Sequence, residues 1–554
     1  MRPMNVTTGV SSGQSSPAHP LLEVRGLTVA LPEGADRSNA VEEISYQLHS
    51  GKITCIVGES GSGKSMTANA IMGLLPKPHV KVTAGQLLFN GSDLLARPDS
   101  EMRTVRGADI SMIFQEPMTA LNPLLTVGEQ IAEVLCKNGP LPRKELRDRI
   151  TKLLADMNLP EPETLQDSYP FRLSGGQRQR IMIAMALALN PKLLIADEPT
   201  TALDVTTQKQ ILHLIREQQK RHGMGVMFIT HDFGVVAEIA DHIVVMEKGE
   251  VVEEGCVEAV LNSPQHPYTR KLIAAVPTLD DHASTTPSEV PLLSVQNICK
   301  TFKTRSGMFT KKREVNALRS VSFDLHEGEI IGLVGESGSG KSTLARSVMQ
   351  LSDIDSGKIA INGEQIGSLG QKLPSFIQFV FQDPYASLNP RRRIGSALTI
   401  GPIHHGVPKA EAISRAREML DVVGLDASAM DRFPHEFSGG QRQRIGIARA
   451  LTMQPRVLIA DEAVSALDVS VQKQVLRLLE DIRLKMGIAI LFVTHDLRVA
   501  ATICHRLLVM RKGELVEEGH TREIFENPKS EYTKSLLEAV PGKNWHKPIL
   551  EERV

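Results

Sequence analysis

One octapeptide, Gly-Glu-Ser-Gly-Ser-Gly-Lys-Ser, occurs twice without change, at residues 58–65 and 335–342. Each copy follows a short apolar run, Ile53–Val57 or Ile330–Val334, that predicts a β-strand. Glycines at these positions let backbone N–H groups converge on phosphate oxygens beside a helix N-terminus. The pattern is that of a phosphate-binding loop, so the sequence predicts two nucleotide sites.

Within each loop the lysine is expected to reach the β- and γ-phosphates, and the final serine to ligate Mg²⁺. The predicted contacts of the first loop are Gly58, Glu59, Ser60, Gly61, Ser62, Gly63, Lys64 and Ser65. Those of the second loop are Gly335, Glu336, Ser337, Gly338, Ser339, Gly340, Lys341 and Ser342.

The duplication extends over nearly all of the 554 residues. The loop lysines are 277 positions apart, and three later pairs of matching residues are each 264 apart, so the motifs keep their order. Strands that alternate with helices predict two α/β domains in tandem. We expect domains at residues 21–277 and 292–541, a polar linker at 278–291, a disordered tail at 1–20 and a C-terminal tail at 542–554.

Composition excludes several classes of function. Lys and Arg (63) balance Asp and Glu (64), so there is no basic excess to bind nucleic acid. No run approaches the roughly 18 apolar residues of a membrane span, and the N-terminus lacks the apolar core of a signal peptide. The five cysteines are widely separated, which indicates reduced thiols rather than a metal or redox site.

A second motif lies downstream in each half. Apolar residues 193–196 and 457–460 each lead into an Asp-Glu pair, Asp197-Glu198 and Asp461-Glu462. The aspartate can hold Mg²⁺ through water, and the glutamate can orient or deprotonate the attacking water. A further apolar run in each half precedes a histidine, His231 or His495.

The third motif, Ser-Gly-Gly-Gln-Arg-Gln-Arg at residues 174–180 and 438–444, resembles the signature of ATP-binding cassette (ABC) proteins. The resemblance covers residues 21–541 and includes Q-loop glutamines, D-loops at 202–204 and 466–468, and the switch histidines. It implies two P-loop ATPase domains, each with a helical subdomain that carries the signature. The implied catalytic residues are Glu198, Glu462, His231 and His495. The implied signature contacts to ATP are Ser174, Gly175, Gly176, Gln177, Ser438, Gly439, Gly440 and Gln441. The implied Mg²⁺ contacts, direct or through nucleotide and water, are Ser65, Gln115, Asp197, Ser342, Gln382 and Asp461.

In this family two cassettes meet head to tail, and each ATP lies between one phosphate loop and the opposite signature. The resemblance therefore implies that each loop forms only half of a site. Both glutamates, both histidines and both signatures are present, so we predict that both sites hydrolyse ATP.

Two departures distinguish the halves. The family stacks adenine on an aromatic residue, which alignment of the halves identifies as Phe302; the first half then has Leu31. Either the first site holds adenine less tightly, or the alignment slips at a segment that is longer in the second half. The second departure is Ala463, where the first half has Pro199.

Segments after each Q-loop and near each C-terminus, such as His-Pro-Tyr-Thr at 266–269, resemble the peptide/nickel/opine importer branch. The implied partners are two integral-membrane permease subunits, which dock at residues 116–125 and 383–393, and an extracytoplasmic solute-binding protein. The implied place is the cytoplasmic face of the inner membrane, and the cargo is peptides, or else glutathione, opines or nickel. Some members of that branch hold an iron–sulfur cluster, but no cysteine lies at residues 276–291 or 540–554, so none is predicted. The alternative is a soluble tandem ABC ATPase that acts on ribosomes or DNA; the short linker and neutral charge disfavour it.

Overall fold

The computed structural model describes residues 19–115, 120–201, 203–277, 290–304, 313–383, 387–465 and 467–548. Most of the predicted tails and of the linker lies outside the described residues. Two compact units form: the first comprises Met1–Pro199, Arg216–Thr230 and Ala240–Val257, and the second comprises Thr200–Ile215, His231–Ile239 and Glu258–Val554. Some segments of the first sequence half therefore belong to the second unit, and the predicted domain boundaries remain a prediction.

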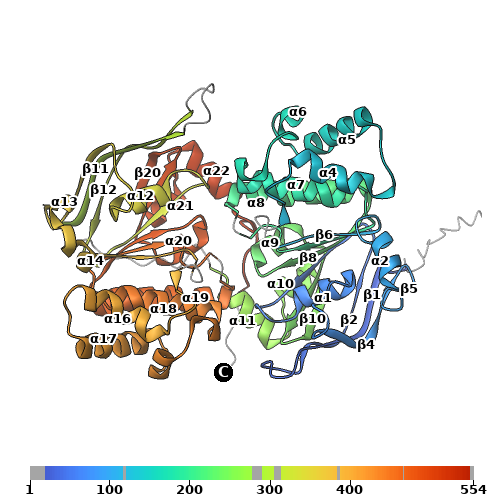
Figure 1. Cartoon of the computed structure of the whole chain (residues 1–554), viewed down its shortest axis with the longest axis horizontal. Helices are drawn as coiled ribbons and strands as arrows, with labels where there is room; N and C mark the ends of the chain where they lie inside the picture. Colours follow the sequence, from blue (N-terminus) through green and yellow to red (C-terminus); the bar gives the residue numbers. More distant parts are fainter. Residues whose placement is uncertain are drawn as a thin grey trace, which may run out of the picture. The chain divides into compact units, whose positions relative to one another are not determined.

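The first unit contains an antiparallel sheet with strand order β2-β1-β4-β5 and a six-stranded sheet with order β10-β9-β3-β8-β7-β6 (Figure 1). The antiparallel sheet comprises β1 (Leu22–Ala30), β2 (Asn39–Leu48), β4 (Lys81–Phe89) and β5 (Ser92–Asp93). The larger sheet comprises β3 (Ile53–Val57), β6 (Ile110–Ile113), β7 (Leu193–Asp197), β8 (Gly225–Thr230), β9 (His242–Glu247) and β10 (Glu250–Cys256). All its pairings are parallel except that of β9 with β10.

The second unit repeats this pair of sheets, with orders β12-β11-β14-β15 and β16-β17-β18-β13-β19-β20. The first comprises β11 (Pro291–Thr304), β12 (Arg313–His326), β14 (Ser356–Ile361) and β15 (Glu364–Gln365). The second comprises β13 (Ile330–Val334), β16 (Ile377–Val380), β17 (Val457–Asp461), β18 (Ala489–Val493), β19 (Arg506–Arg511) and β20 (Glu514–His520).

Helices connect the strands in both units. Those before residue 200 are α1 (Lys64–Met72), α2 (Asp99–Val105), α4 (Val127–Leu135), α5 (Arg143–Asp156), α6 (Pro162–Leu165) and α7 (Gly175–Leu187), with short 3₁₀ turns at Cys136–Asn138 and Pro170–Arg172. Then come α8 (Val205–His222), α9 (Phe233–Ile239), α10 (Val257–Asn262) and α11 (Pro267–Ala275). The remainder are α12 (Lys341–Val348), α13 (Ile366–Leu369), α14 (Leu373–Phe376), α16 (Ile394–His404), α17 (Lys409–Val422), α18 (Gly439–Leu451), α19 (Val469–Met486), α20 (Leu497–Ile503), α21 (Thr521–Glu526) and α22 (Glu531–Ala539), with 3₁₀ turns at Gly370–Lys372, Ala427–Asp431 and Pro434–Glu436.

The cores follow from the sequence of the central strands. Every residue of β3 and of β13 is buried, as expected for apolar parallel strands covered on both faces. Because these strands are fixed by the core, the loops that follow them are held at the carboxyl edge of the sheet, where α/β proteins bind ligands.

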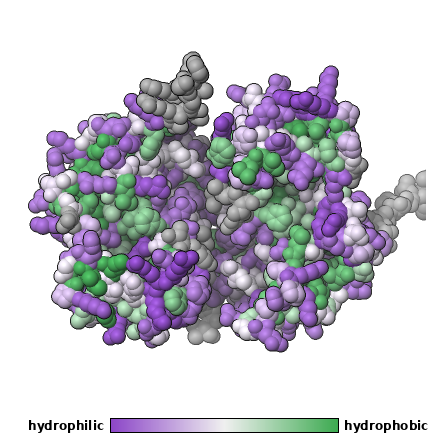
Figure 2. Space-filling view, viewed as in Figure 1, coloured by the Kyte–Doolittle hydropathy of each residue, from purple (hydrophilic) through white to green (hydrophobic). Residues whose placement is uncertain are grey.

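Helices α4, α5 and α7 pack on one another in the first unit, and α16, α17 and α18 do so in the second. The predicted helical subdomain that carries the signature is thus present twice. Large apolar side chains are exposed on both, among them Leu124 and Phe171 of the first unit, and scattered apolar patches interrupt the hydrophilic surface (Figure 2). No helix of the described residues is long and apolar enough to cross a membrane.

Candidate nucleotide sites

The two phosphate loops have the same backbone. Gly63 and Gly340 are the N-caps of α1 and α12 and adopt φ angles of 102° and 110°. A Cβ atom on Gly63 would lie 2.7 Å from the carbonyl oxygen of Ala40, and one on Gly340 would lie 2.5 Å from that of Ala317. Only glycine fits both the space and the left-handed backbone, and each loop therefore delivers a helix N-terminus to its centre.

The loop lysines are buried and turn back over their own loops. Lys64 Nζ donates to the carbonyl oxygens of Gly58 and Glu59 at 2.7 and 2.8 Å. Lys341 Nζ makes the equivalent bonds to Gly335 and Glu336 at 2.7 and 2.9 Å. Burial lowers the pKa of Lys341, although nearby carboxylates oppose this shift. Each ammonium group thus stands inside the curve of its loop, where it can bind phosphate oxygens.

Hydroxyl and carboxylate groups meet beside each loop. Ser65 Oγ donates to Asp197 Oδ1 at 3.0 Å, and Ser342 Oγ donates to Asp461 Oδ1 at 3.2 Å. Burial, followed by the negative charge of Glu198, raises the pKa of Asp197 to about 6. Mg²⁺ prefers such oxygen ligands and would offset the unfavourable burial of the carboxylate, so these residues fit the ion.

The two predicted catalytic glutamates share an unusual backbone. Glu198 and Glu462 have φ angles of 45° and 48°, a left-handed conformation that is strained for non-glycine residues and clusters at functional sites. Their amide groups donate to Ile229 and Val493 on the neighbouring strand, which holds this conformation. Gln115 Nε2 lies 2.9 Å from Glu198 Oε2, and Gln382 Nε2 lies 2.7 Å from Glu462 Oε2. The structure therefore brings each predicted Q-loop glutamine to its own predicted catalytic glutamate.

In the second unit the switch histidine joins this group. His495 Nδ1 lies 3.3 Å from Glu462 Oε1. Burial alone would lower the pKa of His495, but the hydrogen bond and charge of Glu462 outweigh it and raise the pKa above its usual value. Burial would likewise raise the pKa of Glu462, yet His495 and Lys341 hold it below its usual range. Glu462 is therefore held as the carboxylate, the form that accepts a proton. In the first half, His231 belongs to the second unit and Glu198 to the first.

A cavity of about 600 Å³ opens beside the second loop, a size that suits a nucleotide. Lys341, Ser342 and Glu462 line it, and so does Phe302, whose side chain is 44% exposed. Strand register supports the alignment of Phe302 with Leu31. Phe302 pairs with Val315 on the neighbouring strand. Leu31 N donates to the carbonyl oxygen of Ser38, which is the residue equivalent to Val315. Leu31 instead packs against the core of the first unit.

Both signature serines cap their helices as expected. Ser174 Oγ accepts from Gln177 N at 3.3 Å, and Gln177 Oε1 accepts from Ser174 N at 3.0 Å. Ser438 and Gln441 make the same reciprocal pair. These capping boxes satisfy two of the amides at each helix start, and Gly175, Gly176, Gly439 and Gly440 follow immediately in the first turn.

Within the second unit, residues from both sequence halves meet. Asp204 Oδ2, from the first D-loop, accepts from Ser337 N of the second phosphate loop at 3.4 Å. Asp232, which follows His231, makes two hydrogen bonds with the buried guanidinium of Arg498, at 3.0 and 2.7 Å. The sequence identified the D-loop but not this ion pair. Two D-loop residues, Ala202 and Ala466, lie outside the described residues, as do residues 116–119 and 384–386 of the predicted docking segments.

Sequence reasoning also missed Tyr532 of α22. Its hydroxyl accepts from Glu336 N at 3.1 Å, and the Arg511 guanidinium lies 4.7 Å from its ring centre. Burial, followed by the charge of Glu336, raises its pKa to about 12. Tyr532 thus stabilises the second phosphate loop through a hydrogen bond to its backbone. The available signal was the Tyr-Thr pair that recurs near the end of each half.

Comparison with known proteins agrees with this geometry. The sequence profile described as "ABC transporter" matches residues 41–201 and 318–465, and that described as "Oligopeptide/dipeptide transporter, C-terminal region" matches residues 252–311 and 516–553. A protein of Escherichia coli O157:H7 named "Glutathione import ATP-binding protein GsiA" is 48% identical over 558 aligned positions, which cover 94% of this chain and 89% of that protein. The protein of the same name from Salmonella paratyphi A is 47% identical with the same coverage.

Two α/β units with duplicated phosphate loops, acidic strand ends and signature helices define a tandem P-loop ATPase. The chain belongs to the ABC transporter family, and it carries the C-terminal region of the oligopeptide/dipeptide branch after each cassette. It binds and hydrolyses ATP as an ATPase of that family.

Proposed function

We propose that this chain is the ATP-hydrolysing subunit of an importer for glutathione or other short peptides. One observation carries the proposal: similarity to proteins named for glutathione import extends over 94% of the chain, through both cassettes. A match confined to the phosphate loops would support only nucleotide binding. Opines and nickel, which the sequence left open as cargo, have no comparable support.

In the proposed cycle each ATP is bound by the phosphate loop of one cassette and the signature of the other. Ser438, Gly439 and Gly440 complete the site at Lys64, and Ser174, Gly175 and Gly176 complete that at Lys341. Hydrogen bonding of Asp204 to the second loop supports such pairing within one chain. Mg²⁺, held through Ser65 and Asp197 or through Ser342 and Asp461, supplies charge neutralisation at the phosphates.

This chain's own residues then position the water. Glu462, kept ionised beside His495 and held by Gln382, is placed to accept its proton. Glu198 and Gln115 form the same pair in the first half, so we propose that both sites hydrolyse. ATP binding closes the cassettes, and hydrolysis with phosphate release reopens them.

Coupling to transport requires separate membrane proteins. We propose two permease subunits and an extracytoplasmic solute-binding protein as partners, with this chain on the cytoplasmic face of the inner membrane. Exposed Leu124 of one docking segment and exposed Arg391 and Arg392 of the other support two different permease contacts. Arg393 packs over the ring of Phe433 of its own chain at 5.3 Å, so Arg391 and Arg392 are the residues of this basic run that we propose for the permease contact.

Reconstitution tests the proposal. The chain is co-expressed with candidate permease and solute-binding proteins, and the purified complex is placed in liposomes. We expect ATP turnover to rise with glutathione-loaded binding protein and to remain basal with the empty binding protein. Stimulation by glycylglycine but not glutathione would overturn the glutathione assignment and keep the peptide class. Co-purification with ribosomes and no permease would overturn the importer itself.

A further inference from the structure

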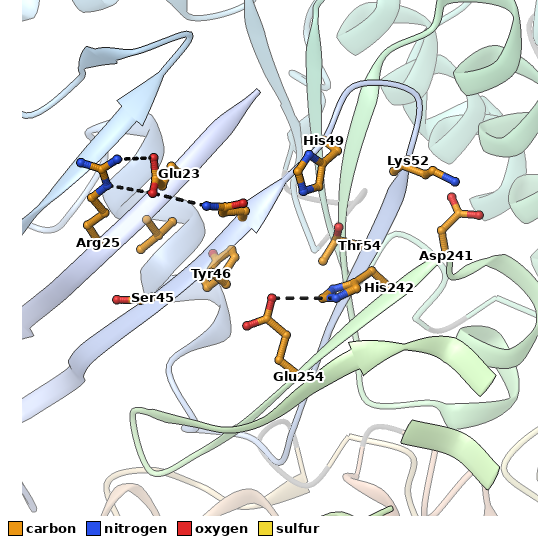
Figure 3. A pocket seen from close by; sticks show the side chains of 12 residues that line it. Glu23, Arg25, Ser45, Tyr46, His49, Lys52, Thr54, Asp241, His242 and Glu254 are labelled. Atoms are coloured by element: carbon orange, nitrogen blue, oxygen red, sulfur yellow. Dashed lines mark hydrogen bonds and ion pairs between the residues drawn. The ribbon is translucent and has the colours of Figure 1, made fainter. Parts of the chain in front are cut away.

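The first unit contains a second cavity, of about 590 Å³, that is separate from the nucleotide site. It lies at the start of β3, near Thr54, whereas the phosphate loop follows the other end of that strand. Tyr46 of β2, His242 of β9 and Glu254 of β10 line it, together with Lys52 (Figure 3). Ligand pockets commonly have this volume, and a pocket so rich in ionisable groups selects for charge.

In the second unit an arginine, Arg506, occupies the equivalent place. Ile331 of β13 pairs with Arg506 of β19, as Thr54 pairs with His242. The Arg506 guanidinium lies 3.1 Å from Glu518 Oε1 and 3.3 Å from Glu329 Oε1, and donates to the carbonyl oxygen of Asp324 at 2.9 Å. One cation thus joins two carboxylates and a strand carbonyl.

In the first unit a histidine replaces this arginine, whereas one of the two carboxylates is kept. His242 replaces Arg506, and its Nε2 lies 3.9 Å from Glu254 Oε1, the counterpart of Glu518. His242 Nδ1 is buried and makes no hydrogen bond to any residue that the structure describes. Burial lowers the pKa of His242 and raises that of Glu254, so the two groups give each other little charge stabilisation. The position beside Glu254 lacks the guanidinium that its counterpart in the second unit contacts.

A second position carries opposite charges in the two units. Lys52 stands where the second unit has the buried Glu329, and its side chain is exposed at the rim. Tyr46, only 3% exposed, replaces Phe323, and its hydroxyl group lies 4.0 Å from Sδ of the buried Met227. Figure 3 shows Lys52 on the opposite side of the pocket from Tyr46, with Thr54 and His242 between them. The pocket therefore presents a carboxylate at one place and an ammonium group at another.

We propose that this pocket binds a small zwitterion, with its guanidinium or ammonium group at Glu254 and its carboxylate at Lys52. A free amino acid with a cationic side chain, such as arginine, has this chemistry: its guanidinium takes the place that Arg506 occupies in the second unit. The site is separate from the nucleotide site and does not depend on the importer role.

Isothermal titration of the full-length chain with L-arginine tests the proposal. We expect saturable binding of one arginine per chain. Agmatine keeps the guanidinium but lacks the carboxylate, and should bind at least about tenfold more weakly, because a charge-assisted hydrogen bond is lost. Absence of saturable binding, or equal binding of agmatine, would contradict the proposal.

Two variants of the first unit and one matched control locate the site. His242→Arg combined with Lys52→Glu rebuilds the filled arrangement of the second unit and should abolish binding. Glu254→Gln should weaken binding at least about tenfold. Glu518→Gln removes the equivalent carboxylate of the second unit and should leave binding unchanged. Basal ATP turnover should persist in all three variants, which would show that they fold. If the double variant does not fold, the binding of arginine by Glu254→Gln decides whether the pocket is the site. Unaltered binding by Glu254→Gln would overturn the proposed site.

Discussion

Around the phosphate loops the two halves are alike, whereas a short distance away they differ. Lys64 and Lys341 make the same pair of bonds to their loops, and Ser65 and Ser342 each bond an aspartate. By contrast, Leu31 faces the core of the first unit, whereas Phe302 lines the nucleotide cavity of the second. The two halves are alike at the predicted phosphate and water contacts, and they differ at the predicted adenine contact.

The likeness of the two halves at the phosphate loops has a chemical reason. Phosphoryl transfer depends on the placement of a few groups, so the residues that touch phosphate tolerate little change. Positions away from the phosphate loops, such as His242 and Arg506, do not take part in that chemistry, and the two halves have different residues there.

The largest effect is expected for the catalytic glutamates. Glu198→Gln and Glu462→Gln, made singly, should each lower ATP turnover more than about a hundredfold, because the general base is lost in one of two coupled sites. Turnover of phosphate by each purified variant measures this. If one variant keeps the wild-type rate, the halves are not functionally alike.

A smaller loss is expected for the loop lysines. Lys64→Ala and Lys341→Ala should each weaken ATP binding at the altered site by about 1.5–3 kcal/mol, since each removes a charged hydrogen bond to phosphate. Titration with a fluorescent ATP analogue measures the affinity. Lys209→Ala, far from either loop in sequence, serves as the control and should bind ATP normally; unchanged affinity in the loop variants would remove the lysines from the site.

The adenine contacts should respond in opposite directions. Phe302→Leu should weaken ATP binding at the second site by about 1–3 kcal/mol, and Leu31→Phe should strengthen it at the first by up to that amount, because a base stacks on an aromatic ring. Comparison of ATP with inorganic triphosphate isolates the contribution of the base. If triphosphate affinity changes as much as ATP affinity, the effect is not stacking.

The smallest effect is expected for the hydrogen bond between Tyr532 and the second phosphate loop. Tyr532→Phe removes one hydrogen bond to the Glu336 amide and should weaken ATP binding at that site by about 0.5–1.5 kcal/mol. Tyr46→Phe, a buried tyrosine of the first unit, is the matched control. Equal changes in both variants would show a general effect on stability.

Much of this arrangement was predictable, because its signals are local. The strands at Ile53–Val57 and Ile330–Val334 have the predicted bounds, and the caps at Ser174 and Ser438 follow from a hydroxyl residue before a helix. Helix α7 begins at Gly175, directly after Ser174, because the capping box places both glycines in its first turn.

Contacts between distant segments could not be predicted from one sequence. Tyr532 is 196 positions from the Glu336 amide that it binds, and Arg498 is 266 from Asp232. No spacing rule connects such residues, since only the folded backbone brings them together. The strained backbone of Glu198 and Glu462 was equally hidden, because it depends on a bond to the neighbouring strand.

We propose that one chain supplies the phosphate loop and the signature of both ATP sites. Equilibrium binding of radiolabelled ATP to the Glu198→Gln, Glu462→Gln double variant, with its mass measured by light scattering, tests it most directly. We expect two ATP molecules per chain in a monomeric, closed form, and we expect both to be lost when Ser174 and Ser438 are also replaced by arginine. One ATP per chain, or two only in a dimer of chains, would contradict it.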